Sequence, residues 1–269
     1  MCMRLDPRAE DWKFEAIPNL GRRIFIGNRT LERLWAYCYG YTTIFSEIQK
    51  AGAADPKAMH NKEEYLLAFY AINWANQLER EHVELPWPDA LPSPLMTGDL
   101  EHIHSANEIF LITAGRIMLH EIAHVVFADA GTDSEDPKEE EFRADEWADW
   151  WMLARWTDYG TDERIYIKRC LGIAIAHAPA LILGFMPQRT SPTHPPPIYR
   201  VLRFIERMGT SSPLTRRPKN LPATFLWMIL LKVLVDNKVL DKEPDLPASY
   251  RDAFMQYARY FEKARDAEL

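Results

Sequence analysis

The stretch LHEIAHVV, residues 119–126, places three ionisable side chains in an otherwise apolar segment. The apolar periodicity around it is helical, and four residues complete slightly more than one helical turn. His120 and His124 therefore project from the same face of one helix. Burying such groups without partners costs several kcal/mol, so the fold must supply a group that compensates them. One ion bound by both imidazoles would do so.

Local sequence signals predict where this helix and the next one begin and end. Ser105 followed by Glu108 has capping-box spacing, so we expect the first helix to begin directly after Ser105. It should stop near Gly131, because glycine favours a helix C-terminus. Asp136-Pro137 is typical of a second helix start, since proline suits the first helical position.

Helical periodicity dominates the remaining sequence, and no break strong enough to divide the chain is visible. Residues 13–27 predict one or two short strands around Gly21. We expect a mainly α fold with a minor N-terminal β element, in one domain that spans residues 1–269. Further helices are expected at 30–50, 62–81, 161–185, 196–208, 222–237 and 247–267.

The composition narrows the class of protein. The formal net charge is −7, so broad affinity for nucleic acid is not expected, and a polybasic patch for a membrane surface is absent from the sequence. The first residues lack the apolar core of a secretion signal. The three cysteines have no CxxC spacing, which argues against a disulfide framework and a thiolate metal site. We expect a cytoplasmic protein without nucleic-acid or membrane partners.

The segment EEEFRADEWA offers a third metal ligand on the second helix. Glu141 and Asp145 are four residues apart and share a face. Two neutral imidazoles and the Glu141 carboxylate form the ligand set of a catalytic Zn²⁺ site whose fourth position is open for water. Glu121 lies about 100° around the helix from His120, close enough to act on that water as general base. Asp145 would accept the free N–H of a ligand histidine and fix its tautomer.

Glu139 and Glu140 lie on other faces of the second helix. As acids in its first turn, they are adequately explained by the helix dipole. The HExxH pattern itself arises by accident in roughly a few per cent of proteins of this size. Its place on an apolar helix, followed by Glu141, favours a metal site over an accident.

A proline-rich loop, TSPTHPPPIYRV at 190–201, holds candidates for transition-state stabilisation. The prolines restrict the backbone, and His194 precedes one of them at the expected start of a helix. A rigid histidine there would donate a hydrogen bond to the oxyanion that forms when water attacks a carbonyl; an ordinary surface histidine is the alternative. Tyr199 is a second candidate for this role. Arg200 would stabilise charge, anchor Asp145 or form a structural ion pair.

Three further histidines have simpler explanations. His102 and His104 form an HxH pair before the main helix, for which a loop or capping role is favoured over metal binding. His177 lies in the apolar segment IAIAHAPALI and is expected to be a hydrogen-bonded core histidine. A role in the active site is the alternative for this residue.

The motifs also resemble known families. HEIAH followed by EFRAD resembles the gluzincin zinc metallopeptidases, and THPPPIYR is similar to the HPPxxxR segment of the CaaX-prenyl-protease and HtpX families. The short gap before Glu141 looks like that of compact relatives, with the phage-exclusion Lit-type peptidases preferred and the ImmA/IrrE type as runner-up. The resemblance covers about residues 105–205, the expected catalytic core. It implies a helical zincin-like fold and, for the Lit type, cleavage of translation elongation factor Tu in phage defence.

The sequence thus predicts a zinc-dependent endopeptidase that hydrolyses a peptide bond in a protein substrate with a zinc-activated water. His120, His124 and Glu141 would hold the zinc, and Glu121 would act as general base. Three alternatives remain: a zinc-stabilised regulatory or interaction module without peptidase activity, an ImmA/IrrE-like regulatory protease, and a helical protein with no metal.

Overall fold

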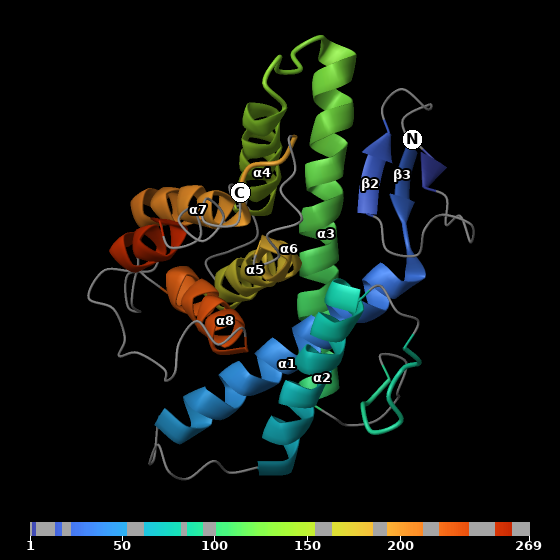
Figure 1. Cartoon of the computed structure of the whole chain (residues 1–269), viewed down its shortest axis with the longest axis vertical. Helices are drawn as coiled ribbons and strands as arrows, with labels where there is room; N and C mark the ends of the chain where they lie inside the picture. The colour runs from blue at the N-terminus through green and yellow to red at the C-terminus, as the bar shows by residue number, and fades with distance from the viewer. Residues whose placement is uncertain are drawn as a thin grey trace. The chain divides into compact units, whose positions relative to one another are not determined.

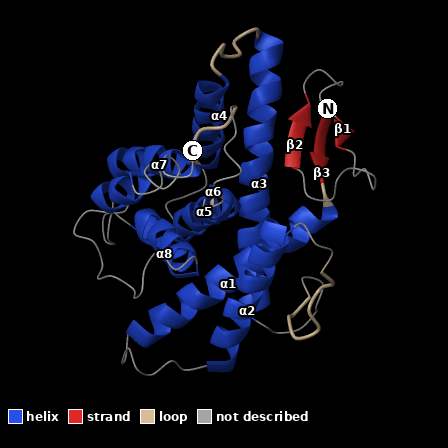
Figure 2. Cartoon of the chain, viewed as in Figure 1, coloured by secondary structure: helices blue, strands red, loops and turns tan. Residues whose placement is uncertain are grey.

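The computed structural model describes residues 2–3, 14–17, 23–52, 62–81, 85–93, 101–153, 163–184, 193–211, 221–236 and 251–259. The fold is mainly α, as the sequence predicts (Figures 1 and 2). The helices are α1 (Asn28–Gly52), α2 (Lys62–Glu81), α3 (Glu101–Ala130), α4 (Pro137–Leu153), α5 (Glu163–Ala176), α6 (Ala178–Gly184), α7 (Pro197–Ser211) and α8 (Leu221–Asp236). Residues 251–259 are also helical.

The chain divides into two compact units, residues 1–122 and 123–269, and the division falls inside the continuous helix α3. The expectation of a single domain over the whole chain stays a prediction. Each unit is therefore described by itself.

The first unit begins with a small sheet of strands β1 (Cys2–Met3), β2 (Phe14–Ile17) and β3 (Arg23–Ile26), in the order β1-β3-β2. β2 and β3 are antiparallel, with Ala16 opposite Ile24, and β1 pairs parallel to β3. Residues 13–27, where one or two short strands were expected around Gly21, thus form two strands.

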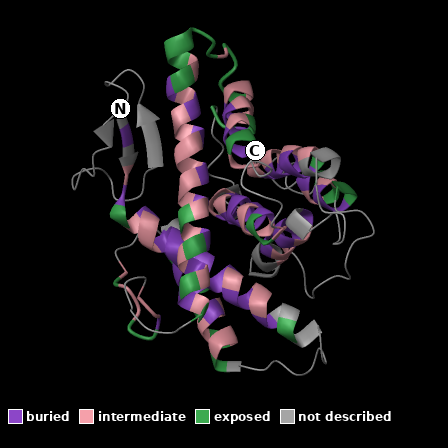
Figure 3. Ribbon diagram, turned by 180° about the vertical axis from the view of Figure 1, so that it is seen from behind, coloured by how far each residue is buried: buried purple, intermediate pink, exposed green. Residues whose placement is uncertain are grey.

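The core of the first unit lies where α1 packs on α2. Buried side chains run along both helices and include Trp35, Tyr37, Ile72 and Leu78 (Figure 3). Gly40 permits the close approach, because a Cβ there would come within 2.8 Å of the Ala68 carbonyl oxygen.

The first part of α3 is tied to α1 by buried polar contacts. The Trp35 indole donates to Asn107 Oδ1 at 2.6 Å, and the Cys38 thiol contacts Thr113 Oγ1 at 3.5 Å. Since α3 begins at Glu101, the predicted start after Ser105 is wrong. Ser105 lies inside the helix, and the capping-box spacing of Ser105 and Glu108 does not mark a terminus.

Burial makes two thiols resistant to ionisation. It raises the pKa of Cys38 and of Cys170 from 9.0 to about 12, and the hydrogen bond with Thr113 opposes the rise at Cys38. Between pH 9 and 12 the unfolded chain loses thiol protons that the native state keeps, so the free energy of unfolding falls as pH rises.

We expect neither thiol to react with Ellman's reagent in native Cys2→Ser protein at pH 8, and both to react in guanidinium. Rapid labelling of either thiol in the native protein would contradict this.

In the second unit, a tight turn joins the end of α3 to α4 (Figure 1). Gly131 has φ 62°, a conformation that side chains rarely adopt, and it ends α3 as predicted. Its amide donates to Ala128 O at 3.2 Å, and the Thr132 amide donates to Phe127 O at 2.9 Å, which together form a Schellman motif. α4 starts at Pro137, as predicted, and Asp136 Oδ1 caps it by accepting from the Lys138 amide at 2.9 Å.

α7 is held against α4 by a row of arginines, Arg200, Arg203 and Arg207, at positions that share one face of α7. Their acidic partners on α4 are Glu139 for Arg203, Asp145 for Arg200, and Glu146 and Asp149 for Arg207. The Arg203 guanidinium also lies 3.7 Å from the centre of the Phe142 ring.

The helix expected at 161–185 is divided, because His177 separates α5 from α6. Pro179 explains the break, since proline cannot donate to the carbonyl four residues earlier and its ring clashes there. His177 is buried beside the Phe204 ring, as expected of a core histidine. The ends of the helix predicted at 247–267 lie outside the described residues.

Among the described helices, α3 alone is long and apolar enough by composition to cross a membrane. This is weak evidence for a span, because the core helix of a soluble protein passes the same test. The middle of α3 also carries Arg116, His120, Glu121 and His124, and ionisable groups are costly in hydrocarbon.

Candidate metal centre

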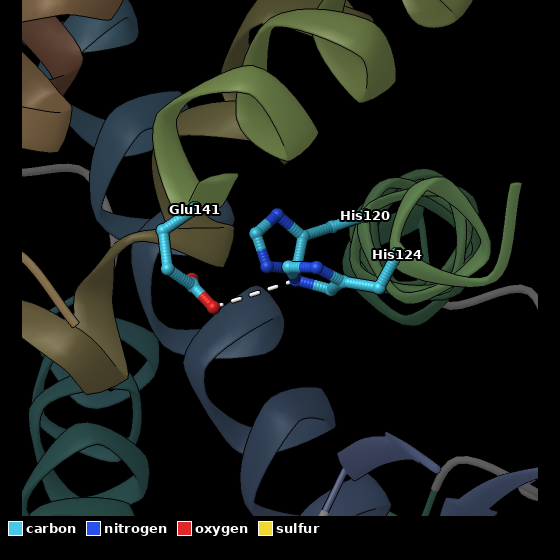
Figure 4. Close-up of side chains that lie close together, drawn as sticks. All are labelled: His120, His124 and Glu141. Atoms are coloured by element: carbon cyan, nitrogen blue, oxygen red, sulfur yellow. Dashed lines mark ion pairs between the residues drawn. The ribbon is translucent and has the colours of Figure 1, made fainter. Parts of the chain in front are cut away.

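His120 and His124 of α3 and Glu141 of α4 offer ligand atoms that all lie within 4.8 Å of one another. Figure 4 shows both imidazoles projecting from α3 toward the Glu141 carboxylate. His120 is 6% exposed and Glu141 7% exposed. The continuous α3 helix fixes the two histidines one turn apart, and the structure brings the third predicted ligand to them.

The α3–α4 turn places Glu141. The Arg143 guanidinium donates to the Thr132 carbonyl at 2.7 Å and lies 4.6 Å from the centre of the Phe127 ring. These contacts fix the first turns of α4 against the end of α3. A residue one turn into α4, such as Glu141, then faces the histidine side of α3.

The His124 ring is held from both sides. Its Nδ1 is 3.0 Å from Glu140 Oε1, and its Nε2 is 3.4 Å from Glu141 Oε1. A carboxylate oxygen accepts hydrogen bonds, so the Nδ1–H of His124 donates a hydrogen bond to Glu140 Oε1 and keeps its proton. The lone pair then lies on Nε2 and faces Glu141, which is the tautomer that a metal ligand needs.

Glu140 was not expected at the site, because a first-turn acid is explained by the helix dipole alone. That interpretation is incomplete. Glu140 Oε1 accepts from His124, and Glu140 Oε2 accepts from the Ser134 amide at 3.0 Å. The spacing from HEIAH to α4 carried no signal for this contact, since it depends on the geometry of the turn between them.

The donor atoms fit a zinc ion. Two ligands bound at about 2.0–2.1 Å around a tetrahedral zinc lie roughly 3.3 Å apart. The 3.4 Å between His124 Nε2 and Glu141 Oε1 matches that separation and is longer than a good hydrogen bond. Two imidazoles and one carboxylate are also a donor set of catalytic zinc sites.

Asp145 lies behind this group and is 2% exposed. Its carboxylate accepts two bonds from Arg200, from Nε at 2.6 Å and from an Nη at 2.7 Å. Arg200 also places a guanidinium nitrogen 3.4 Å from Glu141 Oε2. Arg200 thus anchors Asp145, one of the roles considered for it, and orients Glu141. The hydrogen bond predicted from a ligand histidine to Asp145 stays a prediction.

His194, in the segment before α7, also lies next to Glu141. Its Nε2 is 3.4 Å from Glu141 Oε1, and its Nδ1 is 2.9 Å from Thr193 Oγ1, while 55% of its side chain is exposed. When the Thr193 hydroxyl donates to Nδ1, the ring proton lies on Nε2. Tyr199 is half-buried in the first turn of α7, and Glu121 is half-buried on α3 beside His120.

Replacing Glu140 with alanine should weaken zinc binding by about 10–100-fold, because the partner that fixes the His124 tautomer is removed. Competition with a fluorescent zinc chelator measures this. The matched control is Glu139→Ala, which removes the preceding acid, an exposed partner of Arg203. Equal zinc affinity in the two variants would refute the role of Glu140.

Comparison with known proteins gives one match. A protein-family model described as Peptidase U49 matches residues 24–213, which include α1 to α7 and every site residue described above. Neither the curated proteins nor the solved structures contain a match to the chain.

Proposed function

The chain belongs to the peptidase U49 family and is a peptidase, and we propose that it is a zinc-dependent endopeptidase. The observation that carries the proposal is the His124 ring, whose Nδ1 faces Glu140 while Nε2 faces Glu141 at the separation of two zinc ligands. His120, His124 and Glu141 would hold the ion. A zinc ion there supplies a Lewis acid, which polarises a peptide carbonyl and makes water more acidic.

Glu121 acts as the general base in this proposal. It would take a proton from the attacking water as the C–O bond forms, and deliver that proton to the leaving amine as the peptide C–N bond then breaks. A carboxylate suits both steps because it alternates between an ionised and a protonated form. Its position next to His120 keeps it beside the ligand group without being one of the three clustered ligands.

His194 and Tyr199 assist at the oxyanion. An Nε2–H of His194, which lies 3.4 Å from Glu141 Oε1, would donate to the oxygen that becomes negative as water attacks the carbonyl. Arg200 acts through Glu141 and Asp145, which it orients. Its role is positioning.

We further propose a protein substrate and, on the Lit-type resemblance of HEIAH, EFRAD and THPPPIYR, elongation factor Tu. The test incubates zinc-loaded protein with a bacterial lysate and identifies new N-termini by mass spectrometry. New termini confined to elongation factor Tu support this substrate, and scattered or different termini contradict it. Protein treated with a chelator should produce none, and adding zinc back should restore them. Unchanged cleavage after verified zinc removal would contradict the zinc mechanism.

A second candidate role for these residues is a structural zinc site that stabilises the fold, and one distance favours it. His194 Nε2 is as far from Glu141 Oε1 as His124 Nε2 is, which is the separation of two zinc ligands, although His194 is outside the group whose ligand atoms all lie within 4.8 Å of one another. A shift of His194 toward the two histidines would make it a fourth ligand and close the site. His194→Ala separates the two functions. An oxyanion donor predicts unchanged zinc affinity and lower turnover, whereas a fourth ligand predicts weaker zinc binding.

A further inference from the structure

A second group of ligand-type side chains lies entirely within the first unit. Glu47 of α1, Glu64 of α2 and His102 of α3 offer ligand atoms within 4.8 Å of one another. Three helices contribute one residue each, so the convergence is a product of the tertiary fold and not of spacing along one helix. His102, expected in a loop or cap, is helical and faces this group.

The group is partly shielded and rich in negative charge. The Glu47 side chain is 1% exposed, and the side chains of Glu64 and His102 are 31% and 19% exposed. His102 Nε2 is 2.8 Å from Glu64 Oε2, and the Lys50 ammonium is 2.9 Å from Glu47 Oε1. The hydrogen bond to Glu47 raises the pKa of Lys50 above its usual value; burial opposes this rise, and the negative charges of nearby glutamates add to it. The position therefore attracts cations.

We propose that Glu47, Glu64 and His102 form a second binding site for a divalent transition-metal ion, which clamps α1, α2 and α3 together. Two carboxylates neutralise the two charges of such an ion while the imidazole remains neutral. The mixed donors select the class of ion, because carboxylates alone suit Mg²⁺ or Ca²⁺, whereas an imidazole favours zinc or a neighbouring first-row metal. The exposed end of Lys50, whose side chain is 44% exposed, moves aside toward solvent.

The alternative is a set of ordinary side-chain pairs, in which Lys50 contacts Glu47 and His102 contacts Glu64. That arrangement needs no metal and predicts no specific site. The two descriptions differ in a measurable quantity, the number of zinc ions bound. The clamp does not depend on the proposed peptidase mechanism, since it shares no ligand with His120, His124 and Glu141.

The experiment is a zinc titration by calorimetry, using Zn²⁺ alone and protein stripped with a chelator. A His120→Ala/His124→Ala background removes the α3–α4 site, and one equivalent of zinc should still bind. Adding His102→Ala or Glu64→Gln to this background should lower zinc affinity at least tenfold and abolish the zinc-dependent rise in Tm. The matched controls are His104→Ala and Glu63→Gln, which change exposed neighbours of the same residue types.

Zinc binding that survives both His102→Ala and Glu64→Gln would overturn the proposal, as would no binding in the folded background protein. If the background variant does not fold, as judged by circular dichroism, the same substitutions are made in wild-type protein. Stoichiometry should then fall from two zinc ions to one in His102→Ala and Glu64→Gln and stay at two in both controls. An unchanged stoichiometry overturns the clamp and leaves the peptidase site unaffected.

Discussion

Glu121→Gln should lower peptidase turnover by about 10²–10⁴-fold while zinc remains bound. Glutamine keeps the size and polarity of the side chain, but it cannot accept the proton of the attacking water. Because Glu121 is not among the clustered ligands, zinc affinity should not change. Turnover of a cleaved protein substrate, together with zinc content by mass spectrometry, measures both effects.

The matched control for Glu121 is Glu108→Gln, an exposed glutamate on the same helix. The Glu108→Gln variant should cleave the protein substrate at the wild-type rate. If Glu121→Gln retained full turnover with zinc bound, the general base would have to be another residue. If it lost zinc as well, Glu121 would act on the ligand set and not on the proton.

Arg200→Met should destabilise the protein by about 3–5 kcal/mol, the usual result of removing one partner of a buried ion pair. Asp145 is 2% exposed and loses two guanidinium bonds, and Glu141 loses a charge neighbour. Methionine fills much of the volume of the arginine stem, so the effect reports mainly on charge. Urea unfolding followed by circular dichroism gives the free energy.

Two comparisons make the Arg200 result interpretable. Arg251→Met breaks an exposed pair with Glu206 and should change stability by at most about 1 kcal/mol. Combining Arg200→Met with Asp145→Leu removes both buried charges and should recover part of the loss. A loss in Arg200→Met no larger than in Arg251→Met would show that Asp145 does not depend on its guanidinium partner.

Much of the fold was predictable because its signals are local. Pro137 marks the start of α4 and Gly131 the end of α3, since each residue has an intrinsic backbone preference that tertiary packing need not supply. The strands at 13–27 and the helix at 62–81 follow from periodicity alone. The shared face of His120 and His124 was predictable for the same reason, as i,i+4 spacing on a helix has a fixed geometry.

The predictions that were wrong or incomplete concern features that depend on contacts between distant parts of the sequence. Ser105 and Glu108 have the spacing of a cap, yet α3 continues to Glu101, where His102 pairs with Glu64 of α2. The contact between Glu140 and His124 depends on how the turn after Gly131 orients α4, and no local sequence pattern encodes that orientation. The break at His177 was an exception, because Pro179 was a local signal that the apolar run 171–186 obscured.

The two oxygens of Glu140 have a consequence for measurement. One accepts from His124 and the other from the backbone amide of Ser134, so a single carboxylate connects the His124 ring to the loop between α3 and α4. When the ring is fixed by an ion, the carboxylate should be immobilised too, and the Ser134 amide should exchange its hydrogen with deuterium more slowly. One backbone proton in a surface loop would then report, without any substrate, whether the protein is loaded with metal.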